Sequence, residues 1–403
     1  MTRIPITVHK NCAKHPLLLS HITPGQTTDI EISPQELFAH ATLKFQNPRI
    51  KGKQSFRQTK KKWRNILQRE GDYLRFTNNN LIARSAAGSE DLTELSAVVG
   101  IGCGLIALGH AFDVNISRFK RFKPTNKVMR RMDFEFIASG RRYFHESKGT
   151  TSKYTGNKDR KDISEQKKST RKYCAKNGTS LAGSTGSIVV YRKASATKAS
   201  TTIMLIDPPA GGDGAVSAVD ELISVLNYYQ NIYAVTHTDF MESPSNGRRR
   251  LSIATWLARA VLDLSRGGTP PENSPSHLEV RARAYELGHG DSRYGGTIFD
   301  QRLTRESARK YRNFDAASSA IRSPVRFIGL SDEVTNLITS CRWDRLLEYR
   351  DSAASAQRLE RTAILTSGLM VRDLPRAQEI EDYSRREFAL LRKIALKTKH
   401  LSA

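Results

Sequence analysis

Two segments that flank Gly140 have the alternation expected of a β-hairpin, and this feature limits the fold most. Residues 132–137 read Met-Asp-Phe-Glu-Phe-Ile, and residues 144–149 read Phe-His-Glu-Ser-Lys-Gly. Successive side chains of a strand point to opposite faces, so both phenylalanines of the first segment share one face and its two acids share the other. A tight turn centred on Gly140 and Arg141 would join the two strands.

The charged faces of these two strands come together in the hairpin. Asp133 and Glu135 lie on one face of the first strand, and Glu146 and Lys148 share a face of the second. With the turn in that place, Asp133 lies opposite Lys148 and Glu135 lies opposite Glu146. His145 points to the other face. The hairpin therefore predicts three carboxylates and one lysine on a single patch.

Such a patch suits a metal-dependent hydrolase. Three neighbouring acids repel one another unless positive charge lies among them, and a divalent cation together with a lysine supplies that charge. Hydrolysis of a phosphodiester uses the same groups, because the cation activates water and the lysine stabilises the developing charge. The pattern predicts a Mg²⁺ (or Mn²⁺) site with Asp133, Glu146 and Lys148 as catalytic residues.

The segments around the hairpin predict an α/β fold. Residues 89–112 read as a capped, largely buried helix rich in small residues. The further elements expected up to residue 240 are a strand at 113–117, a helix at 159–176, strands at 187–192 and 201–207, and a helix at 216–233. This order predicts a mixed sheet flanked by helices.

The last third of the chain has a different pattern, which favours helices. They are expected at 251–266, ending on Gly267-Gly268, and near 303–320, 333–362 and 376–398. We therefore expect three regions: a basic mixed region over residues 1–87, an α/β core over 88–240 and a mainly helical domain over 241–403.

The charge of the chain points to a polyanionic partner. Lys and Arg number 65 against 40 Asp and Glu, a formal net charge of +25, and the sequence pI is about 10.0. A basic segment follows Lys148 directly, so it predicts contacts to phosphates and strong salt dependence. The residues expected to bind nucleic acid there are Lys153, Lys158, Lys167, Lys168, Arg171 and Lys172.

Over residues 88–210 the chain resembles the PD-(D/E)xK nuclease superfamily, which has the restriction-endonuclease-like fold. Asp133 matches the first acid and Glu146-Ser-Lys148 matches acid-x-lysine, while Met132 stands where a proline often precedes the aspartate. In some branches a glutamate on the preceding helix joins the metal ligands, a role that Glu94 matches. In others a glutamine on the following helix approaches the site, and Gln166 is the candidate.

The resemblance implies an activity and a setting. It implies a Mg-dependent endonuclease that hydrolyses phosphodiester bonds of DNA in restriction or phage defence. RNA is an alternative substrate. A homodimer or partner subunits of a defence system are the protein partners that it suggests.

Two other functions are compatible with the sequence. The charge alone suits a non-catalytic nucleic-acid-binding protein. An amino-methyltransferase of nucleic acid is suggested by Gly102-Cys-Gly-Leu-Ile-Ala107 and by Asp207-Pro-Pro, although Ala210 stands where that family has a stacking aromatic residue. Close helix packing is the alternative explanation for the glycines.

The sequence favours the cytoplasm. The four cysteines, Cys12, Cys103, Cys174 and Cys341, form no Cys-x-x-Cys pair, and the N-terminus lacks the features of a secretory signal. We counted no uninterrupted apolar run of the ~18 residues that a membrane-spanning helix needs, so no membrane association is expected.

Overall fold

The computed structural model describes most of the chain up to residue 374. The described residues are 1–15, 17–46, 52–84, 87–122, 132–151, 156–195, 200–206, 214–236, 251–275, 278–279, 285–289, 291–299, 325–351, 354 and 361–374. The helices expected at 303–320 and 376–398 lie outside them, as do Lys153 and the Asp207-Pro-Pro turn.

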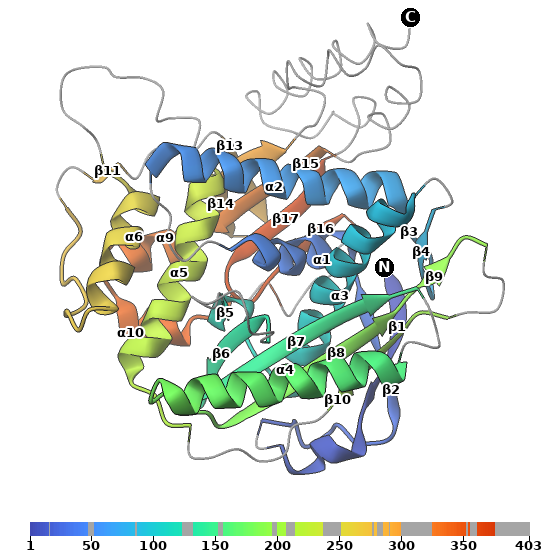
Figure 1. The fold of residues 1–403 in the computed structure, drawn as a ribbon. Coiled ribbons are helices and arrows are strands. Elements are labelled where there is room, and N and C mark those ends of the chain that lie inside the picture. Colours follow the sequence, from blue (N-terminus) through green and yellow to red (C-terminus); the bar gives the residue numbers. More distant parts are fainter. Residues whose placement is uncertain are drawn as a thin grey trace, which may run out of the picture.

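The protein is an α/β structure built on a large mixed sheet flanked by helices (Figure 1). The seven strands run in the order β2-β1-β10-β8-β7-β6-β5, and the β7–β8 and β1–β10 pairs are parallel while the other pairs are antiparallel. Their bounds are Thr2–Val8 (β1), Thr27–Ile32 (β2), Phe119–Arg121 (β5), Phe134–Ala138 (β6), Arg141–Thr150 (β7), Gly183–Val190 (β8) and Thr202–Ile206 (β10). Two strands from the N-terminal region thus belong to the same sheet as the predicted α/β core.

Helices cover both faces of this sheet. Helix α4 (Gly156–Lys176) packs Ile163 and Cys174 against Phe144 and Ile188 on one face. Helix α3 (Ser89–Phe112) covers the other face, as Figure 1 shows. Both helices were predicted. The expected strand at 113–117 is wrong, because Asn115 accepts a hydrogen bond from the backbone N–H of Ser117 and caps a short 3₁₀ turn before β5 begins.

The remaining helices and short strands surround these layers. They are α1 (Pro34–Ala41), α2 (Gly52–Tyr73), α5 (Ala218–Thr236), α6 (Ile253–Leu264), α9 (Asp332–Thr339), α10 (Trp343–Glu348), 3₁₀ turns at Lys10–Lys14, Thr42–Phe45 (η2) and Ile116–Arg118, and strands β3 (Leu74–Phe76), β4 (Leu81–Ala83), β9 (Arg192–Lys193), β11 (Leu251–Ser252) and β12 (Leu278–Glu279).

A second sheet corrects the expectation of a mainly helical C-terminal region. Its five antiparallel strands run in the order β13-β14-β15-β17-β16. Their bounds are Tyr285–His289 (β13), Ser292–Phe299 (β14), Val325–Ser331 (β15), Thr362–Ile364 (β16) and Leu369–Leu374 (β17). The strands of this sheet were not predicted. One of them, β15, is buried along its whole length and therefore shows no alternation of polar and apolar residues. The helix expected over 333–362 is two short helices, α9 and α10.

A buried ion cluster connects the second sheet to the N-terminal helices. Arg326 of β15 has no exposed surface and donates two 2.9 Å hydrogen bonds to Glu70 of α2. It also donates to Asp373 of β17, which accepts a 2.6 Å hydrogen bond from Gln35 of α1. A buried arginine needs this many partners because an unpaired charge is costly in the interior.

Helix α3 is long and apolar enough to cross a membrane by length and composition alone, with a mean hydropathy of 1.9 in its most apolar window. A search for uninterrupted apolar runs did not identify this helix as a candidate. In the fold, 78% of that window is buried inside the protein. Packing against the sheet accounts for its composition.

Small residues bring α3 into backbone contact with β7. A Cβ added at Gly149 would lie 2.0 Å from the Ser96 carbonyl oxygen, and one added at Gly100 would lie 2.5 Å from the Gly149 nitrogen. A Cβ at Gly104 would lie 2.1 Å from the hydroxyl of Ser187 in β8. The helix therefore approaches the strand as closely as the backbones allow.

This contact predicts a stability defect in Gly149→Ala. The new methyl group overlaps backbone atoms that cannot move independently, so we expect a loss of about 1–3 kcal/mol in the free energy of unfolding. Gly288→Ala is the control, because a Cβ there meets no atom within 4 Å. Urea unfolding measures both. Equal stability of the two variants would contradict the contact.

Candidate active site at the open edge of strand β7

The hairpin of β6 and β7 leaves part of β7 unpaired on one side. Strand β6 pairs with Arg141–His145, whereas β7 continues to Thr150 alongside β8. From Glu146 onward the β6 side of β7 faces a pocket instead of a strand. The pocket has a volume of about 680 Å³ and is lined by Glu146–Thr151, Asp133, Gln166, Lys44, Arg121, Lys193 and the first turns of α3.

The turn of the hairpin lies one residue earlier than expected. Ser139 and Gly140 take φ values of 50° and 67°, the left-handed conformation that a two-residue hairpin turn requires at both positions. The predicted cross-strand pairs are therefore wrong: Glu135 lies opposite Phe144 instead of Glu146. Because the register shifts by two residues, every side chain keeps its predicted face.

Asp133, Glu146 and Lys148 meet in the pocket. The Glu146 side chain is only 2% exposed, and its Oε1 accepts a 2.7 Å hydrogen bond from Lys148 Nζ. Its Oε2 accepts a 2.9 Å hydrogen bond from the backbone N–H of Asp133. Asp133 lies 3.6 Å from the guanidinium of Arg121, and both of these side chains are partly exposed.

The two carboxyl groups perturb each other. Burial and the neighbouring Asp133 raise the pKa of Glu146 to about 7, although Lys148 opposes the shift. Burial likewise raises the pKa of Asp133, against the effect of Arg121. Burial alone would lower the pKa of Lys148, but the neighbouring acids Glu146, Asp133 and Asp162 together outweigh it and the net shift is upward. The pocket thus lacks enough positive charge to ionise both acids fully.

Helix α4 contributes Gln166 to the same group. The Gln166 amide hydrogen-bonds Glu146, and its Oε1 is buried with no hydrogen-bond partner in the described structure. One turn further on, Thr170 accepts a 3.1 Å hydrogen bond from the backbone N–H of Met132, which fixes the helix to the start of β6. Gln166 therefore lies where the sequence placed it.

Two other candidate residues lie outside the pocket lining. Glu94 on α3 forms a 2.7 Å ion pair with Arg69, and Glu135 forms a 3.0 Å ion pair with Arg142. His145 points to the opposite face, as expected, and contacts Thr185 and Ser147. The predicted group of three facing acids is therefore a pair, Asp133 and Glu146.

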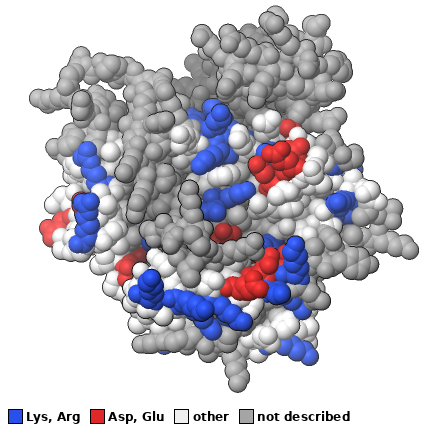
Figure 2. Space-filling view, viewed as in Figure 1, with Lys and Arg blue, Asp and Glu red and all other residues white. Residues whose placement is uncertain are grey.

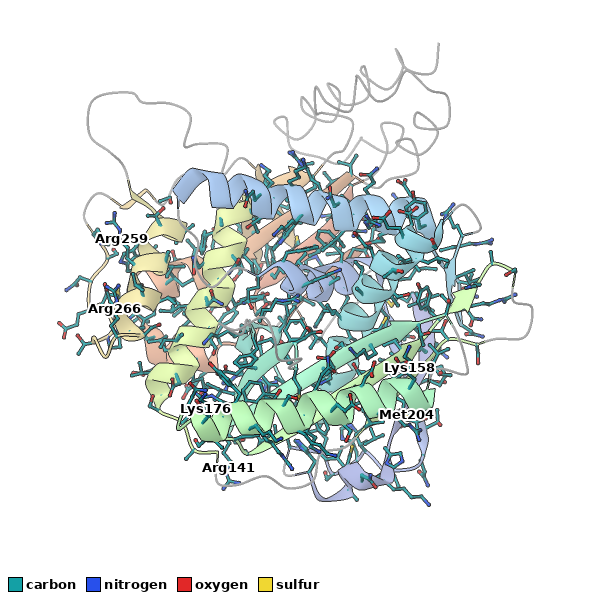
Figure 3. All side chains as sticks on the ribbon, viewed as in Figure 1. Arg141, Lys158, Lys176, Met204, Arg259 and Arg266 are labelled. Atoms are coloured by element: carbon teal, nitrogen blue, oxygen red, sulfur yellow. The ribbon has the colours of Figure 1, made fainter. Side chains whose placement is uncertain are left out.

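In α4 the basic residues that follow Lys148 lie partly on the exposed side of the helix and partly on its buried side. Lys158, Lys168, Arg171 and Lys172 are exposed, whereas Lys167 is 7% exposed and packs inward. Figure 2 shows basic side chains along α4 with acidic ones among them, and Figure 3 marks Lys158 and Lys176 near its two ends. The exposed side of this helix is the part that can contact phosphates.

The sequence missed the basic residues on the other side of the pocket. Lys44 comes from η2, Arg121 from β5 and Lys193 from β9. None of the three follows a motif, and they come from segments that are far apart in the sequence. A run of seven basic residues and no acid over residues 118–131 was a signal for Arg121, and residues 123–131 of this run lie outside the described residues.

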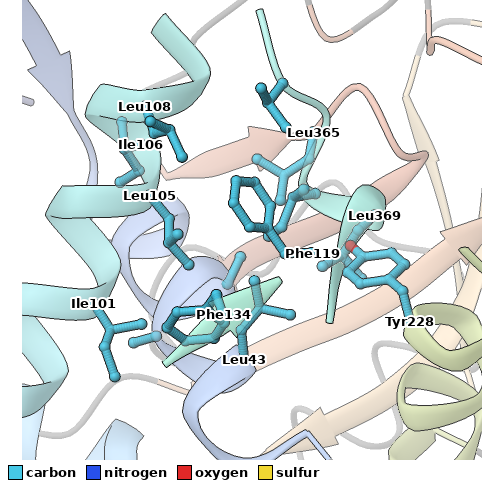
Figure 4. Packing of buried hydrophobic residues seen from close by; sticks show 14 of the residues in the cluster. Leu43, Ile101, Leu105, Ile106, Leu108, Phe119, Phe134, Tyr228, Leu365 and Leu369 are labelled. Atoms are coloured by element: carbon cyan, nitrogen blue, oxygen red, sulfur yellow. The ribbon is translucent and has the colours of Figure 1, made fainter. Parts of the chain in front are cut away.

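The hydrophobic core holds the start of β6 in place. Phe134, the residue after Asp133, is fully buried on the α3 side of the sheet. Figure 4 shows it packed near Leu43 and Ile101. Asp133 points to the opposite face, so the aromatic anchor directs its carboxylate toward the pocket.

The glycine-rich segment of the methyltransferase alternative lies inside α3. Residues Gly102–Ala107 are all buried within the helix, and a Cβ at Gly102 would lie 2.9 Å from the Leu37 carbonyl oxygen. A cofactor-binding glycine motif instead forms a turn between a strand and a helix. The helix-packing explanation of these glycines is confirmed.

Comparison of the chain with protein-family models, with curated proteins and with solved structures found no significant match. Within the described residues, no group of three or more His, Cys, Asp and Glu side chains is close enough to hold a metal ion. Two carboxylates and several waters can hold Mg²⁺, so the pair fits that ion better than one that needs a full protein cage.

The pKa of Glu146 predicts how metal-free stability depends on pH. The ordinary value is 4.5 and the folded value is about 7, so the folded protein keeps a proton that the unfolded chain releases between these values. The free energy of unfolding should therefore fall as pH rises from 4.5 to about 7.

Urea unfolding in chelator at several pH values measures this dependence. Glu146→Gln should flatten it, whereas Glu165→Gln, on the exposed side of α4, should leave it unchanged. A Glu146→Gln variant with the wild-type slope would show that Glu146 does not hold the proton.

Proposed function

We propose that the protein is a metal-dependent nuclease that hydrolyses phosphodiester bonds of DNA in the pocket at the edge of β7. The proposal rests on one observation: Asp133, Glu146 and Lys148 line the same pocket. Glu146 is buried there and accepts hydrogen bonds from Lys148 Nζ and from the backbone N–H of Asp133. Such a group has no evident use in holding the fold, because burying two acids together is costly.

The arrangement supports the resemblance to the PD-(D/E)xK superfamily. Helix α3 leads through β5 into the hairpin, the first acid begins β6, and Glu146-Ser-Lys148 lies on β7. The next helix, α4, brings Gln166 to Glu146. The position of Glu94 departs from the branch in which a glutamate of the first helix joins the metal ligands, because Arg69 holds its side chain.

Asp133 and Glu146 are the residues that would hold Mg²⁺ or Mn²⁺. The raised pKa of both carboxyl groups fits this role, because a divalent cation would supply the positive charge that the pocket lacks. The Glu146 carboxylate accepts hydrogen bonds from Lys148, from the Asp133 backbone and from Gln166, which leaves one of its four lone-pair positions for a cation. When bound, such an ion polarises the phosphoryl group and lowers the pKa of a coordinated water.

The other residues have roles that follow from their positions. Lys148 is held charged by Glu146 and can stabilise negative charge that develops on the phosphate. Gln166 has an unpaired amide oxygen that can accept a hydrogen bond from an attacking water. The exposed lysines and Arg171 of α4 provide phosphate contacts beside the pocket.

A cleavage assay tests this function. Purified protein with Mg²⁺ or Mn²⁺ should cut DNA, and the substrates include unmodified and modified duplex, single strands and RNA. Lys148→Met and Asp133→Asn should each lower the rate about 100-fold or more, because the first removes a positive charge at the reacting phosphate and the second removes a ligand of the cation. Glu135→Gln is the matched control, since that acid of the same hairpin pairs with Arg142 outside the pocket lining.

Two results would overturn the proposal. One is the absence of metal-dependent cleavage of any substrate, which would leave a non-catalytic nucleic-acid-binding protein as the better explanation of the charge. The other is cleavage that survives Lys148→Met, which would place the chemistry elsewhere.

A further inference from the structure

A second cationic group lies on the far side of Asp133 from Lys148. Strand β6 lies between β5 and β7 in the sheet, so Asp133 at its start has Arg121 of β5 on one side and Lys148 of β7 on the other. Lys44 of η2 lines the pocket next to Arg121. The pocket is therefore basic on two sides of its acid pair.

Contacts from distant parts of the chain hold Arg121 in place. Its backbone N–H donates a 2.7 Å hydrogen bond to Gln46 Oε1, and Gln46 Nε2 donates to the Phe119 carbonyl at 3.2 Å. The Arg121 guanidinium donates through Nη1 to the Lys44 carbonyl. The guanidinium also lies 3.6 Å from Asp133 and 5.9 Å from the centre of the Phe134 ring. These contacts within the described residues do not use all five N–H groups of the arginine, which leaves donors for another acceptor.

Like charges are gathered here at a cost to stability. Burial and the neighbouring Arg121 and Arg69 lower the pKa of Lys44, although Glu94 opposes the shift. The ammonium groups of Lys44 and Lys62 both lie over the ring of Phe45, at 5.5 and 5.6 Å from its centroid. Of the acids nearby, Glu94 is paired with Arg69. Positive charge therefore exceeds negative charge on this side, a condition that favours an anion.

We propose that Lys44 and Arg121 form a phosphate-binding subsite for a phosphodiester group next to the one that is cut. The subsite rests on the proposed function in that its ligand is a nucleic-acid backbone. Arg121 offers a planar fork of donors and Lys44 a compact charge, the two cations best suited to phosphate oxygens. A backbone held by Lys44 and Arg121 on one side and by the residues around Lys148 on the other crosses the acid pair.

The salt dependence of binding tests the subsite without a cleavage readout. All variants carry Lys148→Met, and the affinity for labelled duplex DNA is measured with Mg²⁺ over a range of salt concentrations. Each phosphate contact contributes about 0.9 to the slope of log affinity against log salt. Arg121→Met and Lys44→Met should each lower the slope by about this amount and weaken binding about tenfold at low salt. Arg121→Lys, which keeps the positive charge, should have most of the slope that Arg121→Met loses.

Arg259→Met is the matched control. Arg259 is an exposed arginine of α6, which lies away from α4 in Figure 3. Its loss removes the same charge and should leave the slope unchanged. Thermal unfolding of each variant checks that the fold is intact.

The outcomes separate the subsite from the nuclease proposal. Unchanged slopes in folded Arg121→Met and Lys44→Met, or an equal loss in Arg259→Met, would overturn the subsite even in a protein that cuts DNA. The expected losses in a protein that cuts no substrate would support the subsite and overturn the nuclease function.

Discussion

The close contact between α3 and β7 holds the strand that carries Glu146 and Lys148. Because Gly100 and Gly149 allow the two backbones to meet, α3 covers one face of β7 and brings its first turns to the pocket at the strand edge. Helix α4 covers the opposite face and brings Gln166 to Glu146. Strand β7 is thus held from both sides, and its acid and lysine have little freedom to move apart. Such preorganisation is what a site needs in order to stabilise charge.

Charge balance explains why the pocket suits a cation and a polyanion together. Burial raises the pKa of both carboxyl groups, and the neighbouring Asp133 adds to the rise at Glu146, so a divalent ion between them would favour their ionised forms. The walls of the pocket carry Lys44, Arg121, Lys148 and Lys193, which suit the phosphates of a nucleic-acid backbone. These four cations outnumber the two acids of the pocket lining.

The sequence predicted the parts of this site that depend on local periodicity. Alternation along 132–149 gave the faces of Asp133, Glu146 and Lys148, because the alternation of side chains follows from the backbone geometry of a strand. Gln166 was a candidate only through the family resemblance. The register of the β6–β7 hairpin depends on the backbone conformations of Ser139 and Gly140, and the residue types alone do not determine these. Lys44 and Arg121 come together through hydrogen bonds between residues 44–46 and β5 that span more than 70 residues of the chain, and no local pattern encodes such contacts. The second sheet was missed because buried strands such as Val325–Ser331 lack alternation.

We propose that Asp133 and Glu146 together hold a divalent cation, and anomalous diffraction from crystals grown with Mn²⁺ tests this most directly. We expect one anomalous peak within bonding distance of a carboxylate oxygen from each residue, and its loss in Asp133→Asn crystals. A protein that shows no peak between these carboxylates at saturating Mn²⁺, or that keeps the peak in Asp133→Asn, would contradict it.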